Sequence, residues 1–157
     1  MKKEKEKIEF RIYSGSHKEE IIRIFRSNCP KYFNINDEEN LVYFLDNFTD
    51  ENYLVALQEG KVIGCGGHYT KENMHGIAWV MFEKHSLGAN KILNISDLFY
   101  QEIENRIISE GKLFPILINT TQLMERLFNR YGFKTYEVIK DGFGKGLDEY
   151  KMKKLLK

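Results

Sequence analysis

The apolar pattern of the chain changes its period between residues 83 and 91, and this change limits the folds that the chain can adopt. Residues 52–58, 61–70 and 76–83 predict three strands, with a turn at Gly60 between the first two. From residue 91 onward the apolar residues recur at helical spacing, at Ile92, Ile95, Phe99, Ile103 and Ile107. A further strand, 112–120, follows. This order predicts a mixed sheet, with parallel pairing of the strands around the long crossover helix.

Local signals place the elements before this unit. Residues 7–15 alternate between apolar and polar side chains and predict a first strand. Ser16 and Glu19 have the spacing of a capping box, and the apolar helical face behind them ends near Cys29. Residues 36–39 repeat the capping signature before a second helix that extends to residue 48. The chain therefore opens with one strand and two helices.

The C-terminal third continues the alternation of helices and strands. Thr120 or Thr121 caps a helix that runs to Arg130. Gly132 suits the left-handed position after a helix end, where Phe133 folds back as its apolar partner. Two final strands are predicted at 134–140 and 148–156. The order is strand, two helices, three strands, helix, strand, helix and two strands, with no linker or repeat between them.

Composition narrows the class of protein. Hydrophobic residues make up 42% of the chain and charged residues 30%, as in ordinary soluble domains, and 157 residues suffice for one domain with a substantial core. Twenty-four basic and twenty-three acidic residues leave a net charge of +1, which gives no support to nucleic-acid binding. Residues 1–7 are expected to form a solvated tail. No apolar run resembles a signal peptide or a membrane span, so a cytoplasmic protein is expected.

The cysteines and histidines do not predict a metal site. Cys29 and Cys65 are too far apart for a metal or redox pair, and a buried strand position explains Cys65. The four histidines lack the spacing of metal ligands. We therefore expect no metal.

A possible anion site lies where the period changes. A strand, a glycine turn and a helix start present unpaired backbone N–H groups and the positive end of the helix dipole, which suits phosphate or pyrophosphate. Gly88 permits close approach of a ligand, and Lys91 adds a positive charge. One glycine before a helix is, however, more often only a turn.

The whole order of elements resembles the GNAT superfamily of acyl-CoA-dependent N-acetyltransferases, over nearly the entire chain. Residues 119–152, NTTQLMERLFNRYGFKTYEVIKDGFGKGLDEYKM, look like a bacterial subgroup with a KDG-G-GLD-Y-M hairpin, and YLVALQEGKVIGCGG (53–67) resembles the central hairpin of the superfamily. The resemblance implies one domain over residues 1–157. It also implies a mixed, mostly antiparallel sheet of about seven strands flanked by about four helices, and such domains are commonly homodimers.

The resemblance also implies acetyl-CoA as co-substrate and a position for it. The pyrophosphate loop of the superfamily aligns with HSLGAN (85–90), where His85 replaces Gln or Arg and Asn90 replaces a small residue. The residues implied in cofactor binding are Met81, Phe82, His85, Ser86, Leu87, Gly88, Ala89, Asn90, Lys91, Asn119 and Thr120. Of these, the backbone N–H groups near Met81 and Phe82 are expected to stabilise the oxyanion of a tetrahedral intermediate.

The implied reaction is direct attack of a primary amine on the thioester, which requires a base and a proton donor. By the resemblance, Tyr131 is the candidate general acid, because a phenol stays protonated at neutral pH. The alternative is that its ring only plugs the helix end. Glu83, at the exit of a strand, is the candidate base or water-orienting group, and its alternative is a surface carboxylate before a turn.

The acyl acceptor is expected between the first two helices and the C-terminal hairpin. Tyr32, Phe33 and Phe143 are the candidate apolar walls. Four carboxylates could attract a cationic amine, although such residues are more often simply solvated or engaged in capping: Asp37, Glu38, Asp141 and Asp148. The acceptor is left open between a small-molecule amine and a peptide amine. A non-catalytic acyl-CoA-binding or regulatory module on the same fold is the alternative function, followed by an interaction module.

Overall fold

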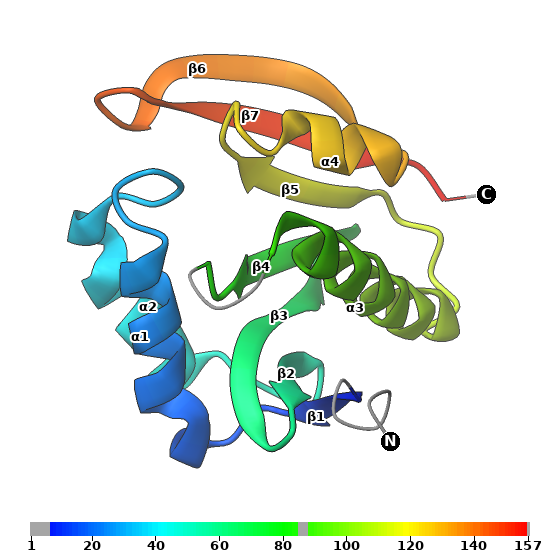
Figure 1. Cartoon of the computed structure of the whole chain (residues 1–157). Coiled ribbons are helices and arrows are strands. Elements are labelled where there is room, and N and C mark those ends of the chain that lie inside the picture. The colour runs from blue at the N-terminus through cyan, green and yellow to red at the C-terminus, as the bar shows by residue number, and fades with distance from the viewer. Residues whose placement is uncertain (1–6, 85–87, 157) are drawn as a thin grey trace.

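A seven-stranded sheet in the order β1-β2-β3-β4-β5-β7-β6 runs through the computed structural model, which describes residues 7–84 and 88–156 (Figure 1). Neighbouring strands are antiparallel except β4 and β5, which flank the long helix and are parallel. The mixed, mostly antiparallel sheet and the predicted order of strands and helices are confirmed. The elements are β1 (Ile8–Ile12), α1 (Lys18–Ser27), α2 (Glu38–Asn47), β2 (Tyr53–Gln58), β3 (Lys61–Lys71), β4 (Met74–Phe82), α3 (Ala89–Ser109), β5 (Ile116–Thr120), α4 (Glu125–Arg130), β6 (Lys134–Gly144) and β7 (Leu147–Lys154).

Helices cover both faces of the sheet, and the alternation of β2 explains why. Successive side chains of a strand point to opposite faces. Leu54 and Ala56 belong to a core cluster with residues of α3 and α4. Val55 and Leu57 belong to a second cluster, with residues of α1 and α2. Because β2 is apolar on both faces, it lies inside the sheet rather than at its edge.

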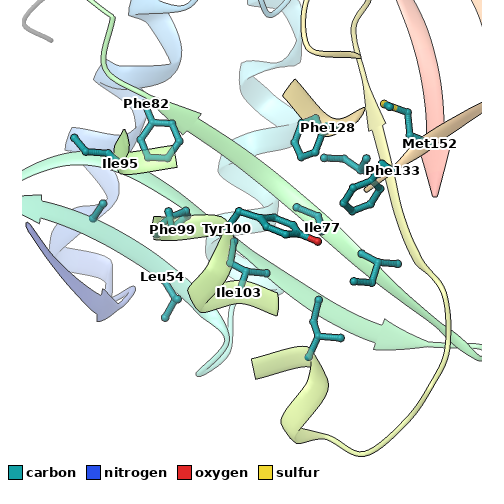
Figure 2. Packing of buried hydrophobic residues seen from close by; sticks show 14 of the residues in the cluster. Leu54, Ile77, Phe82, Ile95, Phe99, Tyr100, Ile103, Phe128, Phe133 and Met152 are labelled. Carbon is teal, nitrogen blue, oxygen red and sulfur yellow. The ribbon is translucent and has the colours of Figure 1, made fainter. Parts of the chain in front are cut away.

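The larger cluster joins the two halves of the sheet through α3. Ile95, Phe99, Ile103 and Ile107 are almost fully buried, at the spacing that predicted this helix. Burying one such side chain contributes roughly 1.5–3 kcal/mol. Figure 2 shows Tyr100 projecting from α3 toward Phe133, which precedes β6, and the two ring centroids are 5.9 Å apart. Among the described residues, no helix combines the length and apolar content that a membrane span needs.

The two N-terminal helices begin later than their capping signals predict. The expectation that Ser16 caps α1 is wrong, because a 3-10 turn, Gly15–His17, precedes the helix and is entered at Ser14. The Ser14 backbone N–H donates to Nδ1 of His17 at 3.1 Å. A second 3-10 turn, Ile35–Asp37, precedes α2, and the Asn34 side chain accepts from the Asn36 backbone N–H at 2.9 Å. Tight turns thus satisfy the first backbone groups of both segments.

The predicted end of α4 is confirmed. Gly132 has a φ of +100°, a left-handed conformation that favours glycine. Its backbone N–H donates to the Asn129 carbonyl at 3.0 Å, and the backbone N–H of Phe133 donates to the Phe128 carbonyl at 2.9 Å. The rings of Phe133 and Phe128 then pack edge to face, with centroids 5.6 Å apart. These two hydrogen bonds and this contact form a Schellman motif.

A buried polar cluster fastens the C-terminal end of α3 to β3 and β4. Glu110 accepts from Nε2 of His68 at 2.6 Å and from the Thr70 hydroxyl at 2.9 Å. Thr70 also bonds Nδ1 of His75 at 2.7 Å, and both histidine side chains are buried. Although burial raises the pKa of Glu110, the hydrogen bonds from His68 and Thr70 outweigh it and hold that pKa below its ordinary value.

We expect Glu110→Gln to lower the free energy of unfolding by about 1–3 kcal/mol at pH 7, because one buried partner loses its acceptor. The depressed pKa of Glu110 means that its contribution is present above the ordinary value of 4.5 and is lost as the pH falls through the folded-state pKa. The free energies of unfolding of Glu110→Gln and the unaltered protein, measured with urea, should therefore converge in acid. Glu102→Gln, which removes a half-exposed pair with Arg106 on the same helix, should cost only about 0.3–0.5 kcal/mol. An equal loss of unfolding free energy in the two variants would contradict the stabilising role of the cluster.

Candidate active site

The two parallel strands at the centre of the sheet separate after two residue pairs. β4 and β5 pair only at His75 with Ile116 and at Gly76 with Leu117. β5 stays paired with β7 along its whole length, so from Ile77 onward the facing edge of β4 has no described strand partner. A cavity of about 680 Å³ lies here, and both strands contribute to its walls.

A β-bulge in β4 accompanies this separation. Between Ala78 and Met81, the residues Trp79 and Val80 oppose the single residue Gly66 of β3. Trp79 has a φ of +46°, which is rare for a bulky residue. A side chain at Gly66 would place its Cβ only 2.6 Å from Cγ2 of Val80, so this glycine is needed for the close approach. Bulges bend the strand that carries them and so redirect its edge.

The Tyr53 hydroxyl fixes the bulge from β2, on the far side of β3. It donates to the Trp79 carbonyl at 2.9 Å. Burial holds the pKa of Tyr53 well above its ordinary value, so the hydroxyl keeps its proton and remains a donor. Burial also raises the pKa of the adjacent Cys65 thiol to about 12, which leaves no thiolate for nucleophilic chemistry near neutral pH.

One end of the cavity opens toward the beginning of α3. Gly88 is the N-cap of this helix, and none of the described side chains caps it. Its φ of −75° is ordinary, and no atom of the described residues lies within 4 Å of the position that a Cβ would occupy. Neither backbone conformation nor packing requires a glycine at this position. Open space and unpaired N–H groups at the end of a helix suit a closely approaching anion.

The structure brings part of the predicted cofactor set to this cavity. Five of the predicted residues line it: Met81, Phe82, Ala89, Asn119 and Thr120. Gly88, Asn90 and Lys91 lie at the first turn of α3, outside the lining. His85, Ser86 and Leu87 lie outside the described residues. Thr121, rather than Thr120, bonds the turn before α4, through the Leu123 backbone N–H at 3.2 Å.

Tyr131 lines the cavity, and its hydroxyl is held by α3. The hydroxyl donates to Oδ1 of Asp97 at 2.8 Å and lies 2.8 Å from Oγ of Ser96. Its ring stacks on Tyr100 with centroids 4.5 Å apart and an interplanar angle of 5°. Burial, together with the Asp97 carboxylate, raises the pKa of Tyr131 above its ordinary value. The phenol therefore stays protonated at any physiological pH.

Glu83, the candidate base, follows β4 but does not line the cavity. Its side chain is 7% exposed, and its two oxygens face Arg23 at 3.3 Å and Lys61 at 3.7 Å. The structure thus pairs this acid with cations from α1 and β3 at the end of β4.

The predicted acceptor residues line the other end of the cavity. Tyr32 and Phe33 come from the connection between α1 and α2, and Phe143 comes from the β6–β7 hairpin. Figure 1 shows that this connection and the hairpin tip lie next to each other. Nδ2 of Asn34 donates to the Phe143 carbonyl at 3.1 Å, which bridges the two segments.

The sequence did not indicate several residues that complete the lining. Trp79 stacks on Phe33 with centroids 6.0 Å apart, and Lys84 places its ammonium 3.9 Å from the centre of the Tyr32 ring. Trp79 lies in a run of apolar strand residues, so only knowledge of the bulge could have identified it. Ser96 and Tyr100 are about one helical turn apart on α3 and face α4. This spacing could have indicated a shared face, but such a pair is also usual in a core.

Neither a protein-family model nor a curated protein matches the sequence, but solved structures match the fold. Ard1 from Thermoplasma volcanium has a TM-score of 0.76 at 12% identity, over 96% of this chain and 98% of that one. An acetyltransferase of the GNAT family from Streptococcus pneumoniae has a TM-score of 0.70 at 18% identity, over 96% and 100%. PaiA N-acetyltransferase from Thermoplasma acidophilum, in complex with coenzyme A, has a TM-score of 0.68 at 17% identity, over 95% and 99%. The fold is therefore that of the GNAT acetyltransferases.

We expect Asn34→Ala to open the acceptor end of the cavity. The change removes the bridge to the Phe143 carbonyl and the acceptor for the Asn36 backbone N–H, at a cost of about 1–2 kcal/mol in the free energy of unfolding. Hydrogen exchange should become faster at 35–38 and at 142–146. Asn47→Ala removes an exposed hydrogen bond from the Asn47 side chain to the Tyr43 carbonyl and should leave hydrogen exchange in both segments unchanged. Unchanged exchange in Asn34→Ala would argue against the bridge.

Proposed function

We propose that this protein transfers an acetyl group from acetyl-CoA to a primary amine. The observation that carries the proposal is the cavity between β4 and β5, which opens toward the uncapped beginning of α3. A pocket between separated strands accepts a long, narrow ligand, and a helix N-terminus beside it accepts the anionic end of that ligand. The likeness to GNAT acetyltransferase folds supports the same conclusion at the level of the fold.

The described residues fit the chemistry of coenzyme A. Gly88 leaves open the space that a side chain would fill, so a pyrophosphate could approach the backbone N–H groups of the first turn. Lys91, in the same turn, adds a positive charge. Deeper in the cavity, Ile92 and Ile118 supply apolar contacts, and Asn119 and Thr120 supply polar groups for an amide-containing arm.

Acetyl-CoA, when bound, supplies a thioester carbon that a neutral amine can attack. The edge of β4 from Ile77 to Phe82 lies free of β5. The Glu83 N–H donates to Ile63 of β3, and alternation turns the Met81 N–H the same way, so the Phe82 N–H at the open edge is the candidate donor to the developing oxyanion. The Phe82 carbonyl is engaged by Nδ2 of Asn28 at 2.9 Å, which holds this end of the strand in place. A donor array fixed before the reaction needs little reorganisation during it.

Protons move at two places in the proposed reaction. Tyr131 is the proposed donor to the leaving sulfur, either directly or through the Ser96 hydroxyl, which lies within hydrogen-bond distance and also lines the cavity. Asp97 accepts the hydrogen bond of the phenol and keeps it protonated, and for the transfer the O–H turns from Asp97 toward the sulfur or Ser96. Glu83 is the proposed acceptor of the amine proton and acts through water, because its side chain does not line the cavity.

We expect Gly88→Asp to weaken coenzyme A binding strongly without loss of fold stability. Asp is a favourable N-cap whose charge suits the helix dipole, so the melting temperature should stay the same or rise. The same charge would face the pyrophosphate and should weaken binding at least 100-fold by calorimetry.

Gly88→Asn is the matched control, because it has the same shape and capping ability without the charge. It should bind coenzyme A more tightly than Gly88→Asp by at least 10-fold. Equal affinity for both variants and the unaltered protein would show that no pyrophosphate lies beside Gly88, and the proposed cofactor position would be abandoned.

We expect Tyr131→Phe to lower kcat by about 10²-fold or more, with little change in the KM for the amine, because only the proton donor is removed. The ring still stacks on Tyr100, so the free energy of unfolding should fall by only about 0.5–1.5 kcal/mol. The measurement is thiol release from acetyl-CoA across amines, with unfolding in parallel. A stable variant with unchanged kcat would reduce Tyr131 to a packing residue.

A further inference from the structure

We propose that the acceptor is a small primary amine with a single positive charge on a flat, apolar body, and that Asp37 binds its ammonium group. This inference rests on the proposed function, because it names the substrate class of the same cavity. Three features of the acceptor end carry it: its charge, its aromatic walls and the bridge between its two sides.

The negative charge of the acceptor end comes from one carboxylate, while the one described lysine of the lining, Lys84, holds its ammonium over the Tyr32 ring. Of the four acids that the sequence offered, only Asp37 lies in the described lining. Glu38 is bound by Arg26 at 2.7 and 2.8 Å. Asp141 and Asp148 accept backbone N–H groups within the hairpin, at 2.8 and 2.9 Å. Three acids are thus engaged in holding the fold, and the lining retains one acid for a ligand.

Asp37 suits an ammonium group because its carboxylate is partly desolvated. Although Asp37 is the N-cap residue of α2, its side chain makes no capping hydrogen bond. Burial raises the pKa of Asp37 above its ordinary value, and the hydrogen bond between the side chains of Asn40 and Asp37 opposes this rise only in part. A bound cation would offset this loss of hydration, which is how a half-buried carboxylate becomes a recognition group.

The walls around Asp37 are aromatic. Phe33 and Trp79 lie nearly parallel, at an interplanar angle of 27°, and Phe44 and Phe143 also line the cavity. A ligand with a flat ring buries apolar area against such surfaces and can stack on them in an offset arrangement. A polyamine or an aminoglycoside would bring several charges to a lining with one described carboxylate, and each further charge would lose hydration without a partner.

The bridge between Asn34 and Phe143 limits the size of the acceptor. It joins the α1–α2 connection to the β6–β7 hairpin beside the cavity. A polypeptide N-terminus needs an open groove for the residues that follow it, whereas a small amine needs only the pocket. The cavity of about 680 Å³ must also hold the acyl end of the cofactor, which leaves the volume of a small molecule.

Trp79 allows acceptor binding to be measured without acetyl transfer. It is the single tryptophan of the chain and lines the cavity, so its fluorescence reports ligand binding directly. We would titrate the full chain with phenethylamine, its neutral analogue phenethyl alcohol, spermidine and phenylalanine. We expect saturable binding of phenethylamine, at least 10-fold tighter than that of each other compound.

The variant Asp37→Asn should weaken phenethylamine binding at least 10-fold and leave phenethyl alcohol unchanged, since Asn keeps the N-cap preference of Asp. Glu39→Gln is the matched control: it removes an exposed carboxylate from the same turn, outside the lining, and should bind phenethylamine like the unaltered chain. Tighter binding of spermidine or phenylalanine, or no effect of Asp37→Asn, would overturn the inference. Phenethylamine binding without acetyl transfer would instead count against the proposed function alone.

Discussion

The hydrogen bond from the Tyr53 hydroxyl to the Trp79 carbonyl is the constraint on which the rest of the molecule depends. A bulky residue at positive φ costs roughly 1–3 kcal/mol and persists only where its surroundings fix it. Tyr53 is fully buried and would lose its partner if the bulge relaxed. The bulge redirects the edge of β4, β5 follows β7 instead, and the pocket exists because the two strands no longer share a ladder.

Most of the fold could be predicted because its signals are local. The spacing of Ile95, Phe99 and Ile103 indicates α3, and the pair Gly132-Phe133 indicates the end of α4, since backbone and side chain act there within one turn. The starts of α1 and α2 were displaced because a serine or asparagine can cap a 3-10 turn as well as a helix. Local sequence signals therefore locate the start of a helix only to within a turn.

The site could be predicted only in part, since its residues acquire their roles from distant contacts. Tyr32, Phe33 and Phe143 were expected in one place and line one cavity. No pattern, however, distinguishes Asp37 from Glu38 until Arg26 is seen to bind the second of them. Likewise, the partners of Tyr131 lie 34 and 35 positions earlier, on a helix whose rotation depends on the core.

The bridge between the α1–α2 connection and the β6–β7 hairpin restricts how these segments can change during evolution. Asn34 and Phe143 are 109 positions apart, and the neighbouring Gly144 would place a Cβ 2.5 Å from Nδ2 of Asn34. A larger residue at 144 therefore requires a smaller one at 34, and the φ of +128° at Gly144 favours glycine there even without Asn34. Among homologues, a side chain at 144 should therefore occur only together with a smaller residue at 34, although no stretch of sequence connects the two positions.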